Sequence, residues 1–570
     1  MDATFVLQTL VESAKAEKKP LYVAFIDFKK AYDYVMRDGL FYKMLQGNML
    51  GPVYRVIHSM YQSVKSVVRC GAEVSQVLHQ HVGLRQGCVF FPCLFSLYIA
   101  DLPAFLREQG CSGVKLYDIV LQVLLYADDG AIVASSEAEL QRALDALSLY
   151  CSRWRLIVNT DKTKVMVVNP PREGQHHFAY DGQRLEIILT FKYLGLLLDD
   201  KGNYATTAKH RLTQGKRLVA AWLRRSEIWS MDPATMVTQF QTCVMPALEY
   251  GVSIWGAGQY NSNVWEQIEV FWRSIAKTVL GVSVRAPNVG VSGELGWLPF
   301  RHRAIQQATA FFTRVTEMPD DALVRKAMQV QRALLASEAT CWLSAYKHAV
   351  CSTEFGMHMW NTWFATHDFR CVCSRENVDV NGRRLGAPIR WEQDVGFFVE
   401  QQLHDEWKLA LMRVEAQKGE GLNKLRTYRL FKTEWGRELY LDVVKKRDQR
   451  ALLTKFRIGI SPLRIETGRY ENVGRSKGVP ACERVCLVCN SDVCIEDEYH
   501  FLMECSAYSM VRTELFDLIR VSGSEIDIDS ENREALFINI MSTANESIIQ
   551  GVALFVMKAF KIRERILLTG

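Results

Sequence analysis

The amino-acid sequence predicts an α+β fold, in which strands and helices are mixed at the start of the chain and helices dominate the rest. Leu21–Asp27 is a nearly continuous apolar run, short enough for a strand buried on both faces. Val120–Ala134 contains two further β segments around Ala127, Asp128, Asp129 and Gly130, where the Asp-Gly pair is a strong signal for a hairpin. From about Asn203 to about residue 350 the apolar residues recur at helical spacing, so this part is expected to be mostly helical.

The remaining elements of the first part follow from local patterns. A helix is expected to open the chain and to end at Lys18–Pro20, where two lysines and a proline break the periodicity. Asp38–Met60 has helical spacing, and Cys70–Val82 alternates polar and apolar residues as a hairpin does. Pro92–Leu106 is apolar enough for a buried helix, and Ser136–Cys151 has the pattern of a helix with one polar face.

Composition indicates an ordinary globular protein and excludes the disordered and fibrous classes, because 49% of the residues are hydrophobic and 23% are charged. Lys and Arg number 69 against 63 Asp and Glu, a surplus that permits binding to a polyanion without marking a dedicated nucleic-acid-binding domain. No signal peptide and no apolar run of roughly 20 residues is evident, so we expect no membrane partner. An intracellular protein, nuclear or cytoplasmic and not secreted, is expected, since the 15 cysteines are mostly scattered singly.

Three aspartates are candidates for a metal site. Asp27 ends the apolar strand, and Asp128 and Asp129 lie at the expected hairpin. Polymerisation of nucleotides uses two divalent ions about 4 Å apart, and Mg²⁺ prefers oxygen ligands. Each motif alone is common, since strands often end in a polar turn. Together, if the two strands are neighbours in one sheet, these carboxylates would form such a site.

Five segments in order resemble the reverse-transcriptase motifs of LINE-type (non-LTR) retrotransposons. They are FIDFKKAYD (Phe25–Asp33), GLRQGCVFFPCLF (Gly83–Phe95), LLYADDG (Leu124–Gly130), NTDKTKVM (Asn159–Met166) and FKYLG (Phe191–Gly195). The resemblance implies an RNA-directed DNA polymerase that extends a DNA primer on an RNA template with deoxynucleoside triphosphates and Mg²⁺ or Mn²⁺. It also implies a palm built on an antiparallel sheet with helices on one face, and Asp27, Asp128 and Asp129 as the metal ligands.

The resemblance assigns nucleotide contacts to four residues, namely Phe28, Tyr32, Arg85 and Gln86. Tyr32 matches the aromatic gate that excludes a ribose 2′-hydroxyl, although a core aromatic on a first helical turn would look the same. The glycines that flank the Arg85–Gln86 pair would let the backbone approach a base pair closely.

A lysine is expected to act on the leaving group. Lys162, or less readily Lys164, matches the lysine that gives a proton to pyrophosphate, and a solvated lysine is the alternative. The segment that follows resembles a primer grip, formed by Phe191, Tyr193, Leu194 and Gly195. The basic helical stretch Asn203–Met231 then falls where a thumb would follow duplex phosphates, unless its charges are merely solvated.

A second cluster has the spacing of a zinc site. Cys486, Cys489, His500 and Cys505 form the pattern C-x2-C-x10-H-x4-C, in which three thiolates and one imidazole leave no open position. A structural Zn²⁺ is therefore expected, with Cys494 and Cys482 as competing thiols and chance clustering of buried cysteines as the alternative. The surrounding residues resemble the C-terminal cysteine-histidine motif of LINE-type proteins, which implies contact with RNA or DNA.

The expected domains are a palm lacking most of the fingers (1–200), a helical thumb and connection (201–350), a mixed, mostly helical region (351–480), a zinc-binding module (481–515) and a helical tail (516–570). The chain begins just before the first motif, so fingers and an endonuclease are expected to be absent. Phe91 stands where the family usually has Ser, and Arg155 replaces a usual Gly. These departures support an alternative, a catalytically inactive retrotransposon remnant that at most binds nucleic acid.

Group II intron maturases and telomerase share the aspartates but do not explain the cluster at Cys486. Three further stretches resemble LINE-type proteins without an evident physical role: EYGVSIWG (Glu249–Gly256), GELGWLP (Gly293–Pro299) and FRIGISPLRIETGRY (Phe456–Tyr470).

Overall fold

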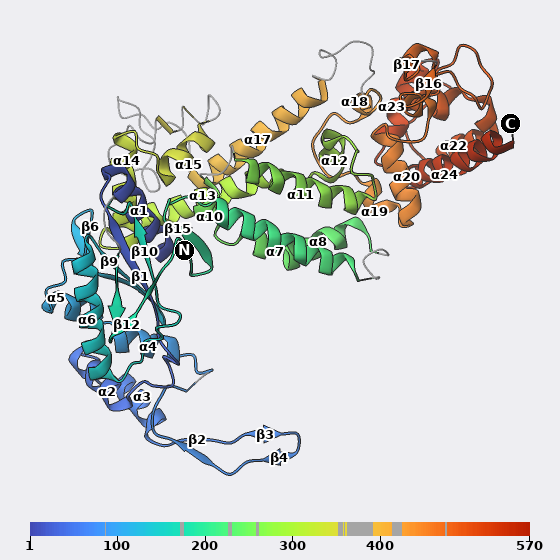
Figure 1. The fold of residues 1–570 in the computed structure, drawn as a ribbon. Coiled ribbons are helices and arrows are strands. Elements are labelled where there is room, and N and C mark those ends of the chain that lie inside the picture. Colours follow the sequence, from blue (N-terminus) through green and yellow to red (C-terminus); the bar gives the residue numbers. More distant parts are fainter. Residues whose placement is uncertain are drawn as a thin grey trace, which may run out of the picture. The chain divides into compact units, whose positions relative to one another are not determined.

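A computed structural model of the protein describes residues 1–85, 87–171, 176–225, 231–257, 262–351, 357, 360–361, 391–412, 424–473 and 476–569. The chain divides into two units. Unit 1 comprises Met1–Ala208, Gly251–Gln259 and Ala308–Arg390, and unit 2 comprises Lys209–Tyr250, Tyr260–Gln307 and Trp391–Gly570. Strands and helices alternate in unit 1 and helices dominate unit 2, as the α+β prediction requires (Figure 1).

A five-stranded sheet with the order β13-β10-β1-β9-β8 is the centre of unit 1. Its strands are β1 (Leu21–Asp27), β8 (Val123–Tyr126), β9 (Asp129–Ala134), β10 (Lys164–Val168) and β13 (Glu186–Ile187). All neighbours are antiparallel except β13, which runs parallel to β10. The expected purely antiparallel sheet is wrong at this edge, because the hairpin of β11 (Ala179–Tyr180) and β12 (Gln183–Arg184) reverses the chain before β13.

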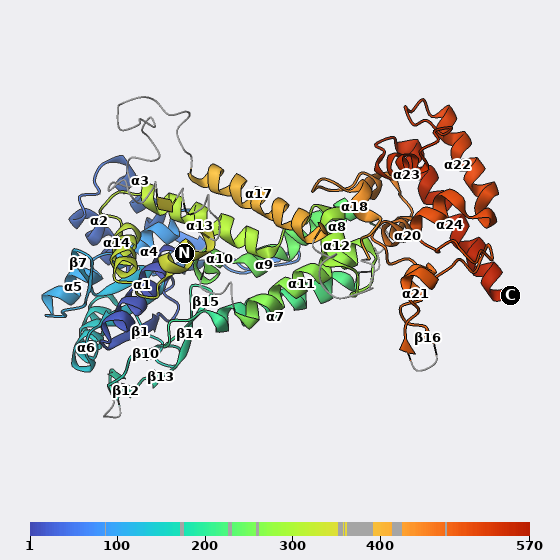
Figure 2. The same cartoon turned by 90° about the horizontal axis from the view of Figure 1, so that it is seen from above.

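Strand β1 is buried on both faces, as its apolar run predicts. Tyr22, Ala24 and Ile26 point to one face and join a hydrophobic core with residues of the unit 1 helices. Phe25 points to the other face and stacks on Phe191 with ring centroids 4.1 Å apart. Phe191 belongs to the hairpin of β14 (Thr190–Tyr193) and β15 (Leu196–Asp199), which lies beside β10 (Figure 2).

The helices of unit 1 agree in part with the predictions, since the single helix expected over Pro92–Leu106 is divided into two, Phe91–Ile99 and Leu102–Glu108. The helices of this unit are α1 (Asp2–Glu17), α2 (Arg37–Gln46), α3 (Pro52–Gln62), α4 (Phe91–Ile99), α5 (Leu102–Glu108), α6 (Glu137–Trp154), α10 (Val252–Trp255), α14 (Leu323–Ala336) and α15 (Trp342–Val350). The helix expected over Asp38–Met60 is broken into α2 and α3, since Gly51 takes a φ of 84° and Pro52 starts a new helix. Helix α6 starts where Ser136 accepts a hydrogen bond from the backbone N–H of Glu139.

A long hairpin projects from unit 1 between α3 and α4 (Figure 1). It consists of β2 (Val64–Ser66) paired with β5 (Leu78–Gln80), and of β3 (Arg69–Cys70) paired with β4 (Glu73–Val74). It is longer than the hairpin predicted over Cys70–Val82. A smaller hairpin, β6 (Val114–Leu116) with β7 (Ile119–Leu121), precedes β8.

The turn between β8 and β9 lies two residues before the predicted Asp-Gly pair. Tyr126 pairs with Asp129, so Ala127 and Asp128 form the turn, and Ala127 takes a φ of 52°. Gly130 instead pairs with Ile26 inside the sheet. Pairing with β1 sets the register of β9 and outweighs the local Asp-Gly preference.

Unit 2 is mostly helical. Its helices are α8 (Pro233–Cys243), α9 (Met245–Glu249), α11 (Asn263–Leu280), α12 (Asn288–Leu295), α17 (Trp391–Met412), α18 (Tyr428–Phe431), α19 (Tyr440–Val443), α20 (Arg447–Arg457), α21 (Arg464–Thr467), α22 (Ser509–Val521), α23 (Arg533–Ser542) and α24 (Glu546–Thr569). Helices α7 (Ala205–Leu223) and α13 (Phe300–Glu317) each begin in one unit and end in the other. Unit 2 also contains a short antiparallel pair of strands, β16 (Asn472–Val473) with β17 (Ser476–Lys477). Helix α24 packs against α20 and α22 (Figure 2).

Two of the sequence stretches without an evident role meet in unit 2. Glu294, from GELGWLP, is fully buried and accepts a hydrogen bond of 2.9 Å from Nε of Arg457, from FRIGISPLRIETGRY. The same guanidinium donates to Glu438 at 2.5 Å. The shared burial and pairing give these stretches a structural role, because a buried guanidinium must be neutralised by carboxylates.

The basic face predicted on α7 is smaller than expected. Arg211 is buried, 7% exposed, and its guanidinium lies 4.7 Å from the ring centroid of Tyr250. Lys216, Arg217, Arg224 and Arg225 are exposed. Four of the predicted phosphate contacts thus remain accessible at these positions, whereas Arg211 serves packing within unit 2.

No single described helix is both long and apolar enough to cross a membrane; α23 and α24 satisfy that test only as a pair, bent by 108°.

Candidate active site and metal cluster

The structure brings the three predicted aspartates together at one end of the central sheet. Asp27 is the last residue of β1 and lies directly opposite Asp129, the first residue of β9. Asp128 precedes it in the turn, so all three carboxyl groups come from two neighbouring strands. Residues directly opposite in an antiparallel pair have Cβ atoms about 4.5–5.5 Å apart. Asp129 is exposed, and Asp27 and Asp128 are partly exposed.

The electrostatics of Asp129 reflect this crowding. Although the residue is exposed to solvent, partial desolvation by its neighbours raises the pKa of its carboxyl, and the negative charges of Asp128 and Asp27 raise it further. Carboxylates that oppose one another in this way lose repulsion when a cation binds between them. The arrangement therefore provides oxygen ligands for a hard divalent cation.

The segment after α6 fixes Asp27 in place. The backbone N–H of Asp27 donates to Oγ1 of Thr163 at 3.2 Å, and its carbonyl accepts from the N–H of Asn159 at 2.7 Å. Nζ of Lys162 lies 3.8 Å from Oδ2 of Asp27. Lys164 lies on β10 and pairs with Glu186 at 2.7 Å. Of the two candidate lysines, Lys162 is therefore the one beside the aspartates.

Tyr32 also contacts the aspartates. Its hydroxyl donates to Oδ1 of Asp128 at 3.2 Å. Burial and the charge of Asp128 raise the pKa of Tyr32 to about 12, so the phenol stays protonated at neutral pH. Its ring packs against Phe91 and Phe95 of α4, with centroid separations of 4.8 and 4.9 Å. The unusual Phe91 thus lies in direct contact with the predicted gate.

The loop Gly83–Arg85 is joined to the first motif by backbone hydrogen bonds. The N–H of Leu84 donates to the carbonyl of Tyr32 at 2.9 Å. Gly83 has a φ of 79°, and a Cβ there would lie 2.7 Å from the backbone oxygen of Asp33. The close approach that requires glycine is therefore to this chain's own backbone. Arg85 is exposed, whereas its backbone N–H donates to the hydroxyl of Tyr61 at 3.3 Å.

Two other predicted nucleotide contacts have different positions. Gln86 lies outside the described residues. Phe28 is 5% exposed and belongs to the hydrophobic core, so its side chain offers little surface to a ligand.

The predicted primer grip is a tight hairpin. Leu194 and Gly195 form its turn with φ of 45° and 84°, the positive values of a two-residue hairpin turn. Tyr193 is buried beside Phe25, 5.6 Å between ring centroids. The contacts with Phe25 place the hairpin beside β1, which ends at Asp27. Burial and the charge of Asp129 raise the pKa of Tyr193.

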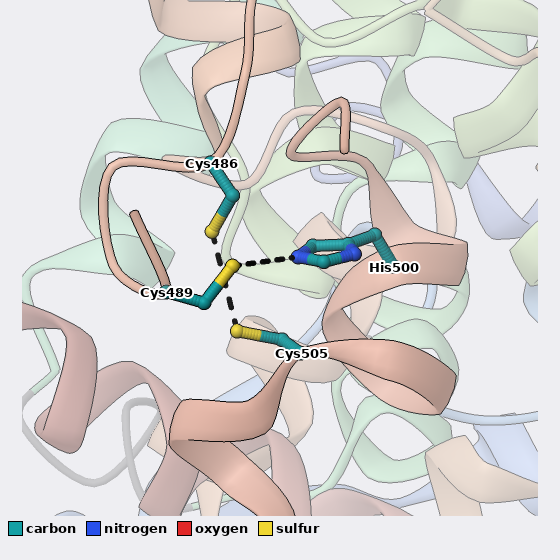
Figure 3. Close-up of side chains that lie close together, drawn as sticks. All are labelled: Cys486, Cys489, His500 and Cys505. Carbon is teal, nitrogen blue, oxygen red and sulfur yellow. Dashed lines mark hydrogen bonds between the residues drawn. The ribbon is translucent and has the colours of Figure 1, made fainter. Parts of the chain in front are cut away.

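The predicted zinc ligands converge in unit 2 (Figure 3). One ligand atom from each of Cys486, Cys489, His500 and Cys505 lies within 4.8 Å of all the others. Sγ of Cys486 is 4.0 Å from Sγ of Cys505, and Sγ of Cys489 is 3.5 Å from Nε2 of His500. The hydrogen bond from Cys505 lowers the pKa of the Cys486 thiol. Cys494 forms a second candidate group with His500 and Glu504, while Cys482 is exposed and belongs to neither group.

The sequence alone did not identify the residues that support this cluster. Oε2 of Glu504 lies 3.2 Å from Nδ1 of His500, which leaves Nε2 facing the thiols. Glu496 is 1% exposed and bonded to Arg563 of α24 at 2.7 and 2.9 Å. Glu498 is paired with Arg426 at 2.5 Å. The His-x3-Glu spacing was the available signal for Glu504; nothing in the sequence pointed to the arginines.

Comparison with known proteins identifies the first third of the chain. Residues 2–198 match the family described as reverse transcriptase (RNA-dependent DNA polymerase). The probable RNA-directed DNA polymerase from transposon BS of Drosophila melanogaster is 30% identical over 267 residues, 43% of this chain and 28% of that protein. The RNA-directed DNA polymerase from mobile element jockey of Drosophila funebris is 28% identical, over 41% of this chain and 25% of that protein.

The chain thus spans little more than a quarter of the length of these relatives. Among solved structures, telomerase from Candida albicans in complex with a fragment of telomeric RNA matches 64% of this chain and 54% of that chain, with 12% identity and a TM-score of 0.28.

Proposed function

We propose that this chain, whose residues 2–198 belong to the reverse-transcriptase family and which is related to the polymerases of non-LTR retrotransposons, is an RNA-directed DNA polymerase. It extends a DNA primer on an RNA template with deoxynucleoside triphosphates. The observation that carries the proposal is the pairing of Asp27 with Asp129 across neighbouring strands, with Asp128 in the adjoining turn.

The carboxylates fit Mg²⁺ or Mn²⁺, because they supply several oxygen atoms within reach of one another and remain partly exposed. Bound there, such ions would activate the primer hydroxyl and stabilise charge on the triphosphate. Asp27, Asp128 and Asp129 hold the ions in this proposal. The hydrogen bonds that the Asp27 backbone donates to Thr163 and accepts from Asn159 support it by fixing that backbone.

The residues around the aspartates have distinct roles in the proposal. Lys162, 3.8 Å from Asp27 and mostly exposed, is positioned to protonate the leaving pyrophosphate. Tyr32 excludes a ribose 2′-hydroxyl sterically, and its bond to Asp128 holds the ring beside the metal ligands. Arg85 and Gln86 contact the nucleotide, and the Phe191–Gly195 hairpin supports the primer end.

The cysteine-histidine cluster fits a structural Zn²⁺. With Zn–S of about 2.3 Å and Zn–N of about 2.0 Å, a tetrahedral ion separates its ligands by about 3.5–3.8 Å. The separations of 4.0 and 3.5 Å are close to these values, whereas a disulfide would need about 2.05 Å. All four groups are then used as ligands, so the ion would stabilise unit 2 and take no part in chemistry. Contact of this module with RNA or DNA, and an intracellular location, complete the proposal.

Primer extension tests the polymerase proposal. The purified chain is given a DNA primer annealed to an RNA template, deoxynucleoside triphosphates and either Mg²⁺ or Mn²⁺. We expect extension that falls at least about a hundredfold in Asp128→Ala and Asp129→Ala, because each removes charge stabilisation from the transition state. Asp145→Ala, an exposed carboxylate on α6, is the matched control and should retain activity. Absence of extension with either ion would refute the proposal.

A catalytically inactive remnant is the second candidate, and the contact between Phe91 and Tyr32 favours it. A phenylalanine at this position narrows the space beside the gate. This candidate predicts salt-dependent nucleic-acid binding without synthesis. Phe91→Ser separates the two candidates. If primer extension is absent from the natural chain and recovered in that variant, the side chain of Phe91 is the cause of the lost activity.

A further inference from the structure

Unit 2 contains a cavity of about 300 Å³ that the proposed polymerase chemistry does not use. Its wall includes Val237 of α8, Trp272 of α11, Trp297 and His302. Gln241, also in the wall, is exposed, so the cavity is accessible from solvent on that side. The volume is at the small end of the range for ligand sites in proteins, about 300–1,000 Å³.

Two buried polar groups in this wall have no hydrogen-bond partner among the described residues. His302 is 1% exposed, and neither ring nitrogen is bonded. Trp297 is 9% exposed, and its indole N–H is also unbonded. Trp272 differs, since its N–H donates to the carbonyl of Leu298 at 2.8 Å. Unbonded buried polar atoms are costly, so His302 and Trp297 are suited to a ligand that supplies the missing partners.

The polar groups are neutral at physiological pH. Burial, together with the charges of Arg303 and Arg301, lowers the pKa of His302 to about 4. One ring nitrogen of a neutral imidazole donates and the other accepts. With the indole N–H of Trp297, these two side chains thus offer two donors and one acceptor and carry no charge themselves.

The apolar part of the wall is aromatic. The rings of Trp272 and Trp297 have centroids 5.0 Å apart at an interplanar angle of 54°, and Phe240 lies 5.7 Å from Trp297. Indole rings bind flat π systems through stacking and edge contacts. The cationic side chain of Arg303 is held by Glu249, which disfavours a site built for free phosphate.

We propose that this cavity binds a single unpaired nucleobase through the indoles of Trp272 and Trp297 and the ring nitrogens of His302. A planar nitrogen heterocycle has the flat apolar faces that the indoles require. The edge of such a heterocycle carries donors and acceptors. These can pair with the unbonded nitrogens of His302 and Trp297. An aliphatic chain would leave those groups unbonded, and a base pair would exceed the volume.

The test measures binding of nucleoside 5′-monophosphates to the full chain by saturation-transfer NMR and by titration. Ribose 5-phosphate, which lacks the base, is the control ligand. Val237→Phe fills the cavity with apolar bulk, and Thr238→Phe places the same side chain on the exposed face of α8 as the matched control. Trp297→Phe removes the indole N–H donor and one of the two fused rings, and it leaves one aromatic ring in the wall. Asp128→Ala tests whether the monophosphate binds at the aspartates of unit 1 instead of in the cavity.

We expect binding of at least one monophosphate that weakens at least tenfold in Val237→Phe and is unchanged in Thr238→Phe and Asp128→Ala. Equal binding of ribose 5-phosphate would overturn the inference, because the phosphate would then be the recognised group. So would binding that is lost in Asp128→Ala and kept in Val237→Phe, or no binding at all. These measurements do not depend on primer extension. The nucleobase site and the polymerase activity can therefore be refuted separately.

Discussion

Arg37 is expected to hold the base of the projecting hairpin closed. Its side chain is 7% exposed, and its guanidinium donates to four backbone carbonyls. The distances are 2.6 Å to Gln80, 3.0 Å to Gly83, 3.2 Å to Val82 and 3.4 Å to Tyr61. The side chain thus connects α2 and α3 to strand β5 and to the loop that carries Arg85.

The cost of removing this guanidinium can be worked from those bonds. Hydrogen bonds from a charged donor contribute about 1.5–3 kcal/mol each, and the bonds to Gln80 and Gly83 have good distances. Arg37→Met keeps the apolar stem of the side chain and removes every donor. Because the freed carbonyls can be hydrated when the hairpin opens, we expect the low end, about 3 kcal/mol. The hairpin would then open about a hundredfold more often.

Hydrogen exchange measured by mass spectrometry on peptides covering Val64–Gln80 tests this expectation, since it reports local opening of the β2–β5 pair. Arg69→Met is the matched control, because Arg69 lies exposed near the hairpin tip and, within the described part of the chain, its side chain bonds only to the nearby carbonyl of Gly71. Unchanged exchange in Arg37→Met, or equal acceleration in the two variants, would refute the reasoning.

Three further expectations concern other sites. Cys505→Ser should reduce bound zinc, measured by elemental mass spectrometry, from about one per chain to near zero, because a structural site needs all four ligands; full zinc content would contradict the assignment. The pKa of His302 is about 4 in the folded protein and about 6.5 in the unfolded chain. Because the unfolded chain therefore binds the proton at a higher pH, the free energy of unfolding decreases as the pH falls from about 6.5 to 4. Urea unfolding at both pH values should show that His302→Phe removes about 3 kcal/mol of this loss; an equal loss in both proteins would exclude His302 as its source. Gly83→Ala should lower the free energy of unfolding by more than about 2 kcal/mol, because the new methyl group would strain the backbone and also clash with the backbone of Asp33. Gly87→Ala is the control, since a methyl group there strains the backbone but meets no neighbouring atom. Equal losses of stability in the two variants would show that the clash with Asp33 is relieved.

Local patterns were enough to predict the strands that carry the aspartates and several of the helices. The apolar run that ends at Asp27 is buried on both faces as predicted, and α6 begins directly after Ser136, where the predicted helix starts. The predicted hairpin around Asp128 exists, but its turn is shifted, because pairing of β9 with β1 sets the register. Local turn preference is weaker than a row of cross-strand contacts.

The sequence by itself predicted the candidate metal ligands, because their residue types and spacing suit metal coordination and lie in segments that resemble known motifs. Asp27, Asp128 and Asp129 came from carboxylates at strand ends, and Cys486 and its partners from thiolate spacing. Such signals are local or follow a fixed order along the chain. They could therefore be read without knowing which strands are neighbours.

Only the tertiary structure decided which residues meet. It distinguished Lys162 from Lys164, brought Phe91 against Tyr32 and buried Arg211 beside Tyr250. The unbonded nitrogens of His302 became evident in the same way. Burial and pairing across long sequence separations depend on how helices and strands pack, and a single sequence records those contacts only through residue types that fit many partners.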